Sequence, residues 1–259
     1  MGVAIIDKTS LFDPVNALGK LVPVMNGLTA LHFDGKARGL NQKINGSAFT
    51  VVGSPVNEND NVTDYSETAY VKTQQACTDE GTFIAVVRLF KNEGAINNTI
   101  LGWYANTGSR GVSLLIAATS RLMLSCTVLA SDGVTKNNIF TSLPLSNFTS
   151  DAVYTAGRWG CVVGRWYKNS SGIFTLKVNN LTENTSAELA APTGSTLVTN
   201  TLGNPFLIGS GYVSTDNQGA GAKALGCTAL YNRALSDTEL QIMYTGYLKG
   251  YFSRREITI

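Results

Sequence analysis

Short stretches of β-branched and aromatic residues alternate with turns rich in Gly, Asn and Ser along most of the chain. Residues 82–90 (TFIAVVRLF) are long enough for a central strand, and the tetrapeptide KNSS at 168–171 is typical of a hairpin connection. Strand signals cover residues 28–33, 82–90, 98–104, 111–117, 121–129, 138–142, 158–167, 172–178, 206–209 and 223–231. No β-α-β alternation and no repeat of about 20–50 residues is present, so the pattern predicts an all-β antiparallel sandwich or barrel.

A single helix is predicted near the C-terminal end. Residues 236–239 (SDTE) have the form of a capping box, in which Ser236 is the N-cap and Glu239 reaches back to its backbone. Gly246 marks the expected end of the helix. The apolar face that would dock on a sheet consists of Leu240, Met243, Tyr244 and Tyr247.

Composition divides the chain into three parts. We expect an extended N-terminal arm over residues 1–27, the folded domain over residues 28–247 and a C-terminal tail over residues 248–259. The aromatic and basic residues of that tail suit either a docking surface for neighbouring subunits or a last strand of the sandwich. The first residues, MGVAIID, lack a basic region and predict no signal peptide. No apolar run approaches the roughly 20 residues needed to span a bilayer.

Charged residues are scarce, at 15%, against roughly 25% in an average soluble protein. Hydrophobic residues make up 44%, which argues against disorder. A net charge of +2 gives no electrostatic reason to expect nucleic acid or an anionic membrane as the main partner. The four cysteines form no CxxC pair and the chain has one histidine, so free, buried thiols are expected rather than zinc ligands. They are Cys77, Cys126, Cys161 and Cys227.

Several segments carry a resemblance to the laminin-G-like, concanavalin A-like jelly-roll superfamily. Residues 225–240 (LGCTALYNRALSDTEL) resemble its signature strand, NRALS turn and short helix, and residues 205–209 (PFLIG) resemble its strand ending in Ile-Gly. Further similar segments are residues 30–35, 82–89, 156–159 and 173–179. The resemblance covers about residues 28–246 and implies a two-sheet antiparallel jelly-roll sandwich with one short C-terminal helix. It implies no single function, because one fold hosts many.

The low charge and the Gly-, Asn- and Thr-rich composition also resemble those of bacteriophage virion proteins. That resemblance implies a non-enzymatic structural or decoration protein of the tail or capsid surface, assembled in the host cytoplasm. Its partners would be other virion subunits, in a homo-oligomer, and its loops would contact host glycans. The alternatives are a stand-alone carbohydrate-binding lectin module and a polysaccharide-cleaving enzyme.

Aromatic rings beside polar residues near turns are candidates for sugar binding. An aromatic ring stacks on a pyranose face, while Asn, Asp and Arg hydrogen-bond the hydroxyl groups. The candidate residues are Trp103, Tyr104, Asn106, Arg110, Trp166, Tyr167, Tyr212 and Asp216. Packing is the alternative for each, and strand alternation places either Trp166 or Tyr167 in the core. Trp159 is excluded, because the family resemblance matches it to a core position.

Residues 57–64 (NENDNVTD) offer the hard oxygen ligands that suit calcium. The candidate ligands are Asn57, Glu58, Asp60 and Asp64. The central Gly and distal Glu of an EF-hand loop are missing, so a solvated polar loop is the alternative. No other cofactor is expected.

No catalytic residue is predicted. His32, the one histidine, lies inside a predicted strand and is expected to be structural. The chain also lacks the Glu-x-Asp-x-x-Glu strand that many enzymes of the resembled superfamily carry. Two carboxylates brought together by folding would be needed for glycoside cleavage.

Overall fold

The computed structural model describes residues 22–36, 49–94, 96–103, 111–148, 157–198, 205–211 and 223–259. Strands of the first sheet are β1 (Leu28–Phe33), β3 (Val56–Asn59), β4 (Val62–Tyr65), β6 (Gly81–Leu89), β11 (Arg158–Lys168), β12 (Phe174–Asn180), β13 (Thr185–Ala190) and β16 (Lys223–Tyr231). Strands of the second are β2 (Thr50–Val52), β5 (Tyr70–Lys72), β7 (Asn98–Gly102), β8 (Ser113–Ala117), β9 (Arg121–Leu129), β10 (Lys136–Pro144), β14 (Thr196–Leu197) and β15 (Leu207–Ile208).

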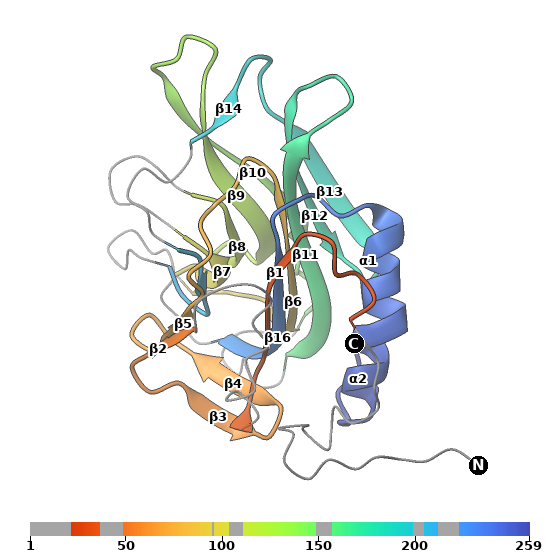
Figure 1. Ribbon diagram of the computed structural model, residues 1–259. Helices are drawn as coiled ribbons and strands as arrows, with labels where there is room; N and C mark the ends of the chain where they lie inside the picture. The colour runs from red at the N-terminus through yellow and green to blue at the C-terminus, as the bar shows by residue number, and fades with distance from the viewer. Residues whose placement is uncertain are drawn as a thin grey trace, which may run out of the picture.

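The two antiparallel sheets pack face to face (Figure 1). The first has the order β13-β12-β11-β6-β16-β4-β3, with β1 also beside β16, and the second has the order β10-β9-β8-β7-β15-β5-β2, with β14 also beside β9. This arrangement confirms the predicted all-β, two-sheet antiparallel sandwich of the jelly-roll type. Of the helices in the described residues, none is long and apolar enough to cross a membrane.

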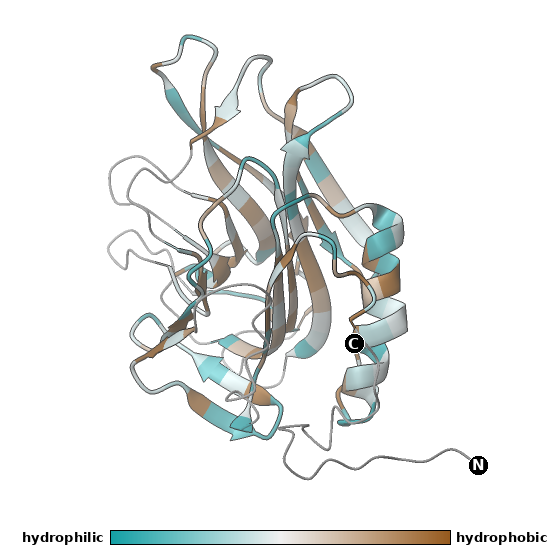
Figure 2. Cartoon of the chain, viewed as in Figure 1, coloured by the Kyte–Doolittle hydropathy of each residue, from teal (hydrophilic) through white to brown (hydrophobic). Residues whose placement is uncertain are grey.

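The central strands of the first sheet are buried on both faces. Along β6, Phe83, Ala85 and Val87 belong to the core between the sheets, whereas Ile84 and Val86 belong to a second apolar cluster beneath the C-terminal helix. Alternate side chains of a strand point to opposite faces, so a strand covered on both sides needs apolar residues at every position. Figure 2 shows hydrophobic residues along these central strands, while the helix carries both kinds.

The C-terminal helix begins as predicted but continues further. Helix α1 (Asp237–Met243) has the expected capping box, and Arg233 and Ser236 help to hold the pKa of Glu239 at about 2. The helix then runs through a π-helical turn, η3 (Tyr244–Leu248), into α2 (Lys249–Ser253). The predicted end at Gly246 is therefore wrong. Tyr251 and Phe252 bury against the first sheet, and such burial outweighs the cost of about 1 kcal/mol for a glycine inside a helix.

Described residues before β1 and after α2 contribute to the cluster beneath the helix. The predicted tail, residues 248–259, begins within the helix, and Ile257 and Ile259 pack with the sheet of the same chain. Residues 1–21 of the predicted N-terminal arm lie outside the described residues, whereas Val22 and Val24 belong to this cluster. The four cysteines are free, and all but the half-buried Cys77 are fully buried.

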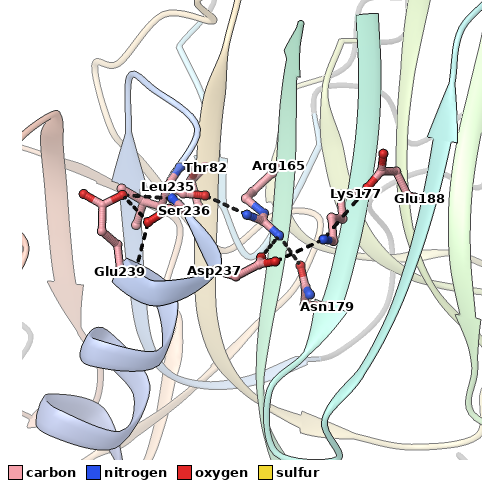
Figure 3. A network of polar contacts seen from close by, with 9 residues as sticks. All are labelled: Thr82, Arg165, Lys177, Asn179, Glu188, Leu235, Ser236, Asp237 and Glu239. Atoms are coloured by element: carbon pink, nitrogen blue, oxygen red, sulfur yellow. Dashed lines mark hydrogen bonds and ion pairs between the residues drawn. The ribbon is translucent and has the colours of Figure 1, made fainter. Parts of the chain in front are cut away.

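Polar contacts fix the NRALS turn and the start of the helix against the first sheet (Figure 3). The Thr82 hydroxyl donates to the backbone carbonyl of Arg233 and accepts from the Leu235 N–H, both at 2.9 Å. The buried Arg165 guanidinium donates to the Leu235 carbonyl at 2.7 Å and pairs with Asp237. The segment that resembles the superfamily signature is thus bound to β6 and β11.

Replacing Asp237 with alanine is expected to lower the free energy of unfolding by about 2 kcal/mol. The Arg165 side chain is 6% exposed and would keep its charge without a carboxylate. The value lies below that of a fully buried pair because the Asp237 side chain is 69% exposed. In urea denaturation, the double variant with Arg165→Met should lose less than the sum of the single losses. Additive losses would contradict the role of the pair, and Glu93→Ala, which removes the carboxylate of the exposed Lys91–Glu93 pair, serves as the control.

Candidate functional site

The tryptophans predicted to bind sugar lie in the core. Trp103 and Trp166 are each 1% exposed, and the Trp166 ring packs edge-on against Phe83 and Phe206. Their proposed stacking on a sugar is therefore wrong, because both rings fill space between the two sheets. Tyr167 points to the opposite face of β11 and is half-buried. The other candidates, Tyr104, Asn106, Arg110, Tyr212 and Asp216, lie outside the described residues.

Protein side chains already engage the predicted calcium ligands. Arg88 donates to both carboxylate oxygens of Glu58 at 2.7 Å, and this contact keeps the pKa of Glu58 below its usual range. Lys36 pairs with Asp60 at 3.0 Å, and the Asn57 side chain accepts from Thr63 at 2.9 Å. Within the described part of the chain, no group of three His, Cys, Asp or Glu side chains could hold a metal ion. Calcium binding by Asn57, Glu58, Asp60 and Asp64 stays a prediction.

His32 lies in a buried polar cluster and is 0% exposed. Its Nε2 is 3.2 Å from the Tyr65 hydroxyl, which donates to Asp34. Lys223 is also buried in this end of the core and donates to the Gly209 carbonyl at 2.8 Å. These contacts agree with a structural histidine.

A cleft of about 510 Å³ opens where β11 begins. It lies within the range of roughly 300–1,000 Å³ that is usual for small-molecule sites. We call it the Trp159 cleft. Its walls come from β6, from the segment after β10, from the start of β11, from the end of β12 and the turn after it, and from the residues that follow α2. They are Leu89, Phe148, Gly157, Arg158, Trp159, Asn180, Thr182, Glu183, Glu256 and Thr258.

The indole of Trp159 is half-buried and supported from one side. Trp159 lies directly opposite Arg88 in the pairing of β11 with β6, and the Arg88 guanidinium stands 5.0 Å from the ring centroid. Because Glu58 binds that guanidinium through two hydrogen bonds, the cation is fixed over the ring. Arg88 does not line the cleft. The ring is thus oriented from outside the cleft, and it is one of the cleft's few aromatic surfaces.

Polar groups of the Trp159 cleft are also held in place. The Arg158 guanidinium stacks over the Phe148 ring at 4.4 Å and pairs with Glu183 at 3.1 Å. The backbone N–H of Glu183 donates to the Asn180 side-chain oxygen at 3.3 Å. The cleft therefore presents a guanidinium, a carboxylate and an amide together with the rings of Phe148 and Trp159, a combination suited to ligands that carry both apolar faces and hydroxyl groups.

The sequence predicts this kind of site on other residues. The superfamily resemblance matches Trp159 to a core position and so points away from it. The available signal was its place at the start of a strand, beside the charged Arg158 and on the same face as Arg165, rather than on the inner face with Trp166.

A smaller cleft of about 180 Å³ lies between β12, β13 and α1. It is lined mainly by polar side chains, including Lys177, Asn179 and Asp237. The charges pair with one another, because Lys177 lies 3.4 Å from Asp237 and 3.9 Å from Glu188 (Figure 3). This arrangement fits a contact between helix and sheet better than a binding site.

Fold and cleft together define a jelly-roll β-sandwich with an aromatic and polar cleft at one end of a sheet. No protein-family model and no curated protein matches the sequence. Among solved structures, the chain is similar to the binding domain of botulinum neurotoxin serotype D, with a TM-score of 0.55 and 13% identity over 86% of this chain and 52% of that one.

Two related structures are similar to the same degree. One is the binding domain of botulinum neurotoxin DC in complex with SialylT (TM-score 0.54, 11% identity, 85% of this chain and 51% of that chain covered). The other is from work on the entry of botulinum neurotoxin type C into cells through interaction with two ganglioside molecules (TM-score 0.52, 11% identity, 85% of this chain and 51% of that chain covered). The chain spans about half the length of these structures, and at such identities the likeness shows the fold alone.

Proposed function

We propose that the chain is a non-enzymatic carbohydrate-binding module and that the Trp159 cleft receives the glycan. The observation that carries the proposal is that the half-buried indole of Trp159, the Arg158–Glu183 pair and Asn180 line one cleft of suitable size. The similar neurotoxin structures support it, since they are binding domains and two are described with SialylT or gangliosides. Because this chain spans about half of each neurotoxin structure, the likeness does not identify which residues of this chain would bind a glycan.

Binding would follow from rigid, preformed walls. The apolar face of a pyranose ring packs on the indole, while its hydroxyl groups donate to Glu183 and accept from Arg158 and Asn180. Trp159 and Arg158 lie on a central strand and are braced by Arg88 and Phe148, respectively. Little side-chain freedom is then lost on binding, which favours affinity.

Replacing Trp159 with alanine is expected to weaken glycan binding at least tenfold. Loss of ring stacking worth about 1.5 kcal/mol corresponds to this factor. Binding to a glycan array, followed by titration calorimetry on the strongest ligand, would measure it. Phe140→Ala, which removes a 57%-exposed ring of the second sheet, is the matched control. Equal binding by the Trp159 variant, at unchanged melting temperature, would contradict the site.

A polysaccharide-cleaving enzyme is the competing function, because Glu183 and Glu256 line the same cleft. The pairing of Glu183 with Arg158 supports a binding role instead. Reducing ends released from a bound polysaccharide by the wild type, and not by Glu256→Gln, would overturn the non-enzymatic part of the proposal.

The bacteriophage virion role stays a prediction from composition. Neither the fold nor the similar structures support the tail or capsid location, the partner subunits, the homo-oligomer or assembly in the host cytoplasm. Loss of the chain from purified particles after deletion of residues 1–26 would favour that role over a free lectin.

A further inference from the structure

Charges in the Trp159 cleft are unevenly distributed. Among the described lining residues, Arg158 is the one cationic side chain, and Glu183 and Glu256 are both acidic. Arg158 is already paired with Glu183 at 3.1 Å. The nearby guanidinium of Arg88 does not line the cleft and is bound by both oxygens of Glu58. The lining therefore carries an excess of negative charge.

We infer that the Trp159 cleft selects neutral, hydroxyl-rich glycans and rejects glycans that carry a carboxylate, such as sialylated ones. This inference rests on the proposed function, since it names the ligand class of the same site. It differs from what the likeness to a structure with SialylT would suggest. It comes from the charges of this chain alone.

The chemistry of an ion pair favours a hydroxyl group over a carboxylate. A hydroxyl donates to a carboxylate and accepts from a guanidinium, so neighbouring sugar hydroxyls can join the Arg158–Glu183 pair without breaking it. A carboxylate only accepts. It could bind only the N–H groups of Arg158 that Glu183 leaves free, and it would then lie in the same cleft as the carboxylates of Glu183 and Glu256.

A second contact holds Arg158 near Glu183. Its guanidinium lies over the Phe148 ring at 4.4 Å, which favours the position in which it pairs with Glu183. Like charges placed together in a partly closed cleft repel strongly, and such repulsion is a usual means of excluding a wrong ligand. We expect a terminal sialic acid to weaken binding at least tenfold.

The test uses an array of matched glycan pairs that differ only by a terminal sialic acid, including N-acetyllactosamine and its sialylated form. We expect neutral members to bind at least tenfold more strongly than their sialylated partners. We also expect the affinity for neutral members to change little between about 50 and 500 mM NaCl. Equal or stronger binding of the sialylated members, still lost in Trp159→Ala, would overturn the charge selectivity and leave the carbohydrate-binding function intact. Binding of neither kind would overturn both.

A reversal variant tests the assignment to these carboxylates. Glu183→Gln with Glu256→Gln leaves Arg158 as the charge of the lining, so the preference for neutral over sialylated glycans should fall at least tenfold. Glu188→Gln makes the same change on an exposed carboxylate of β13 outside the cleft and should keep the wild-type preference. An unchanged preference in the double variant, with binding retained, would overturn the inference.

Discussion

Replacing Gly209 with alanine is expected to lower the free energy of unfolding by about 2–5 kcal/mol. Gly209 has φ of +79°, a conformation that costs an L-residue about 1–2 kcal/mol. An added Cβ would also lie 2.3 Å from the Tyr65 side chain, whose hydroxyl is fixed by Asp34. Tyr65 is buried between the sheets and cannot move aside, so overpacking adds about 1–3 kcal/mol.

The matched control is Gly133→Ala, which separates the two costs. Gly133 has φ of +69°, but nothing lies within 4 Å of an added Cβ. Only the conformational cost of about 1–2 kcal/mol applies there. Urea denaturation of both variants at one pH measures the difference. Equal losses would show that the contact with Tyr65 does not constrain this position.

Elements whose signals are local in sequence could be predicted. The capping box of residues 236–239 forms as expected because its hydrogen bonds join residues three apart. The strand at residues 82–90 was predicted from an apolar run that reflects burial on two faces. Gly209, which ends a segment of the superfamily resemblance, is explained by its positive φ and by the nearby Tyr65 ring.

Features that depend on distant contacts could not be predicted. The helix passes Gly246 because Tyr251 and Phe252 find a sheet to pack against, and this contact joins segments far apart in sequence. The exposure of Trp159 depends on how far the C-terminal helix and the residues after it extend over β11. Its counterpart Trp166 looks similar in sequence, but faces the second sheet and is buried. Strand alternation places one ring outside, while only the tertiary fold shows that a cleft lies beside it.

Lys223 is the basis of a pH-dependent prediction, because it is a cation placed in the core. Its side chain is 0% exposed, and Nζ donates to the Gly209 carbonyl at 2.8 Å. Burial lowers the pKa of Lys223 from its ordinary value of 10.5 to about 7, although Glu67 acts in the opposite direction. The protonated amine is therefore less favourable in the folded state than in the unfolded state.

Stability should consequently rise with pH above about 7. Between the folded and unfolded pKa values the unfolded chain binds more protons, so the free energy of unfolding increases, by about 1.5 kcal/mol from pH 7 to 8.5. Burial also raises the pKa of all four thiols, that of Cys161 to about 12, so these groups oppose the trend as the pH nears their ordinary value of 9.0 and reduce the net rise to about 1 kcal/mol. Denaturation in urea across pH 7 to 8.5 is therefore the measurement.

Lys223→Met should remove the rise of stability with pH, because it replaces the buried amine by an apolar side chain of similar length. Below about pH 7 the variant should be at least as stable as the wild type, since it no longer carries a buried cation. Lys136→Met, made at an exposed position of β10, is the control and should keep the rise with pH. If stability still rises with pH in the Lys223 variant, another group causes the rise, and the assignment to the buried amine is wrong.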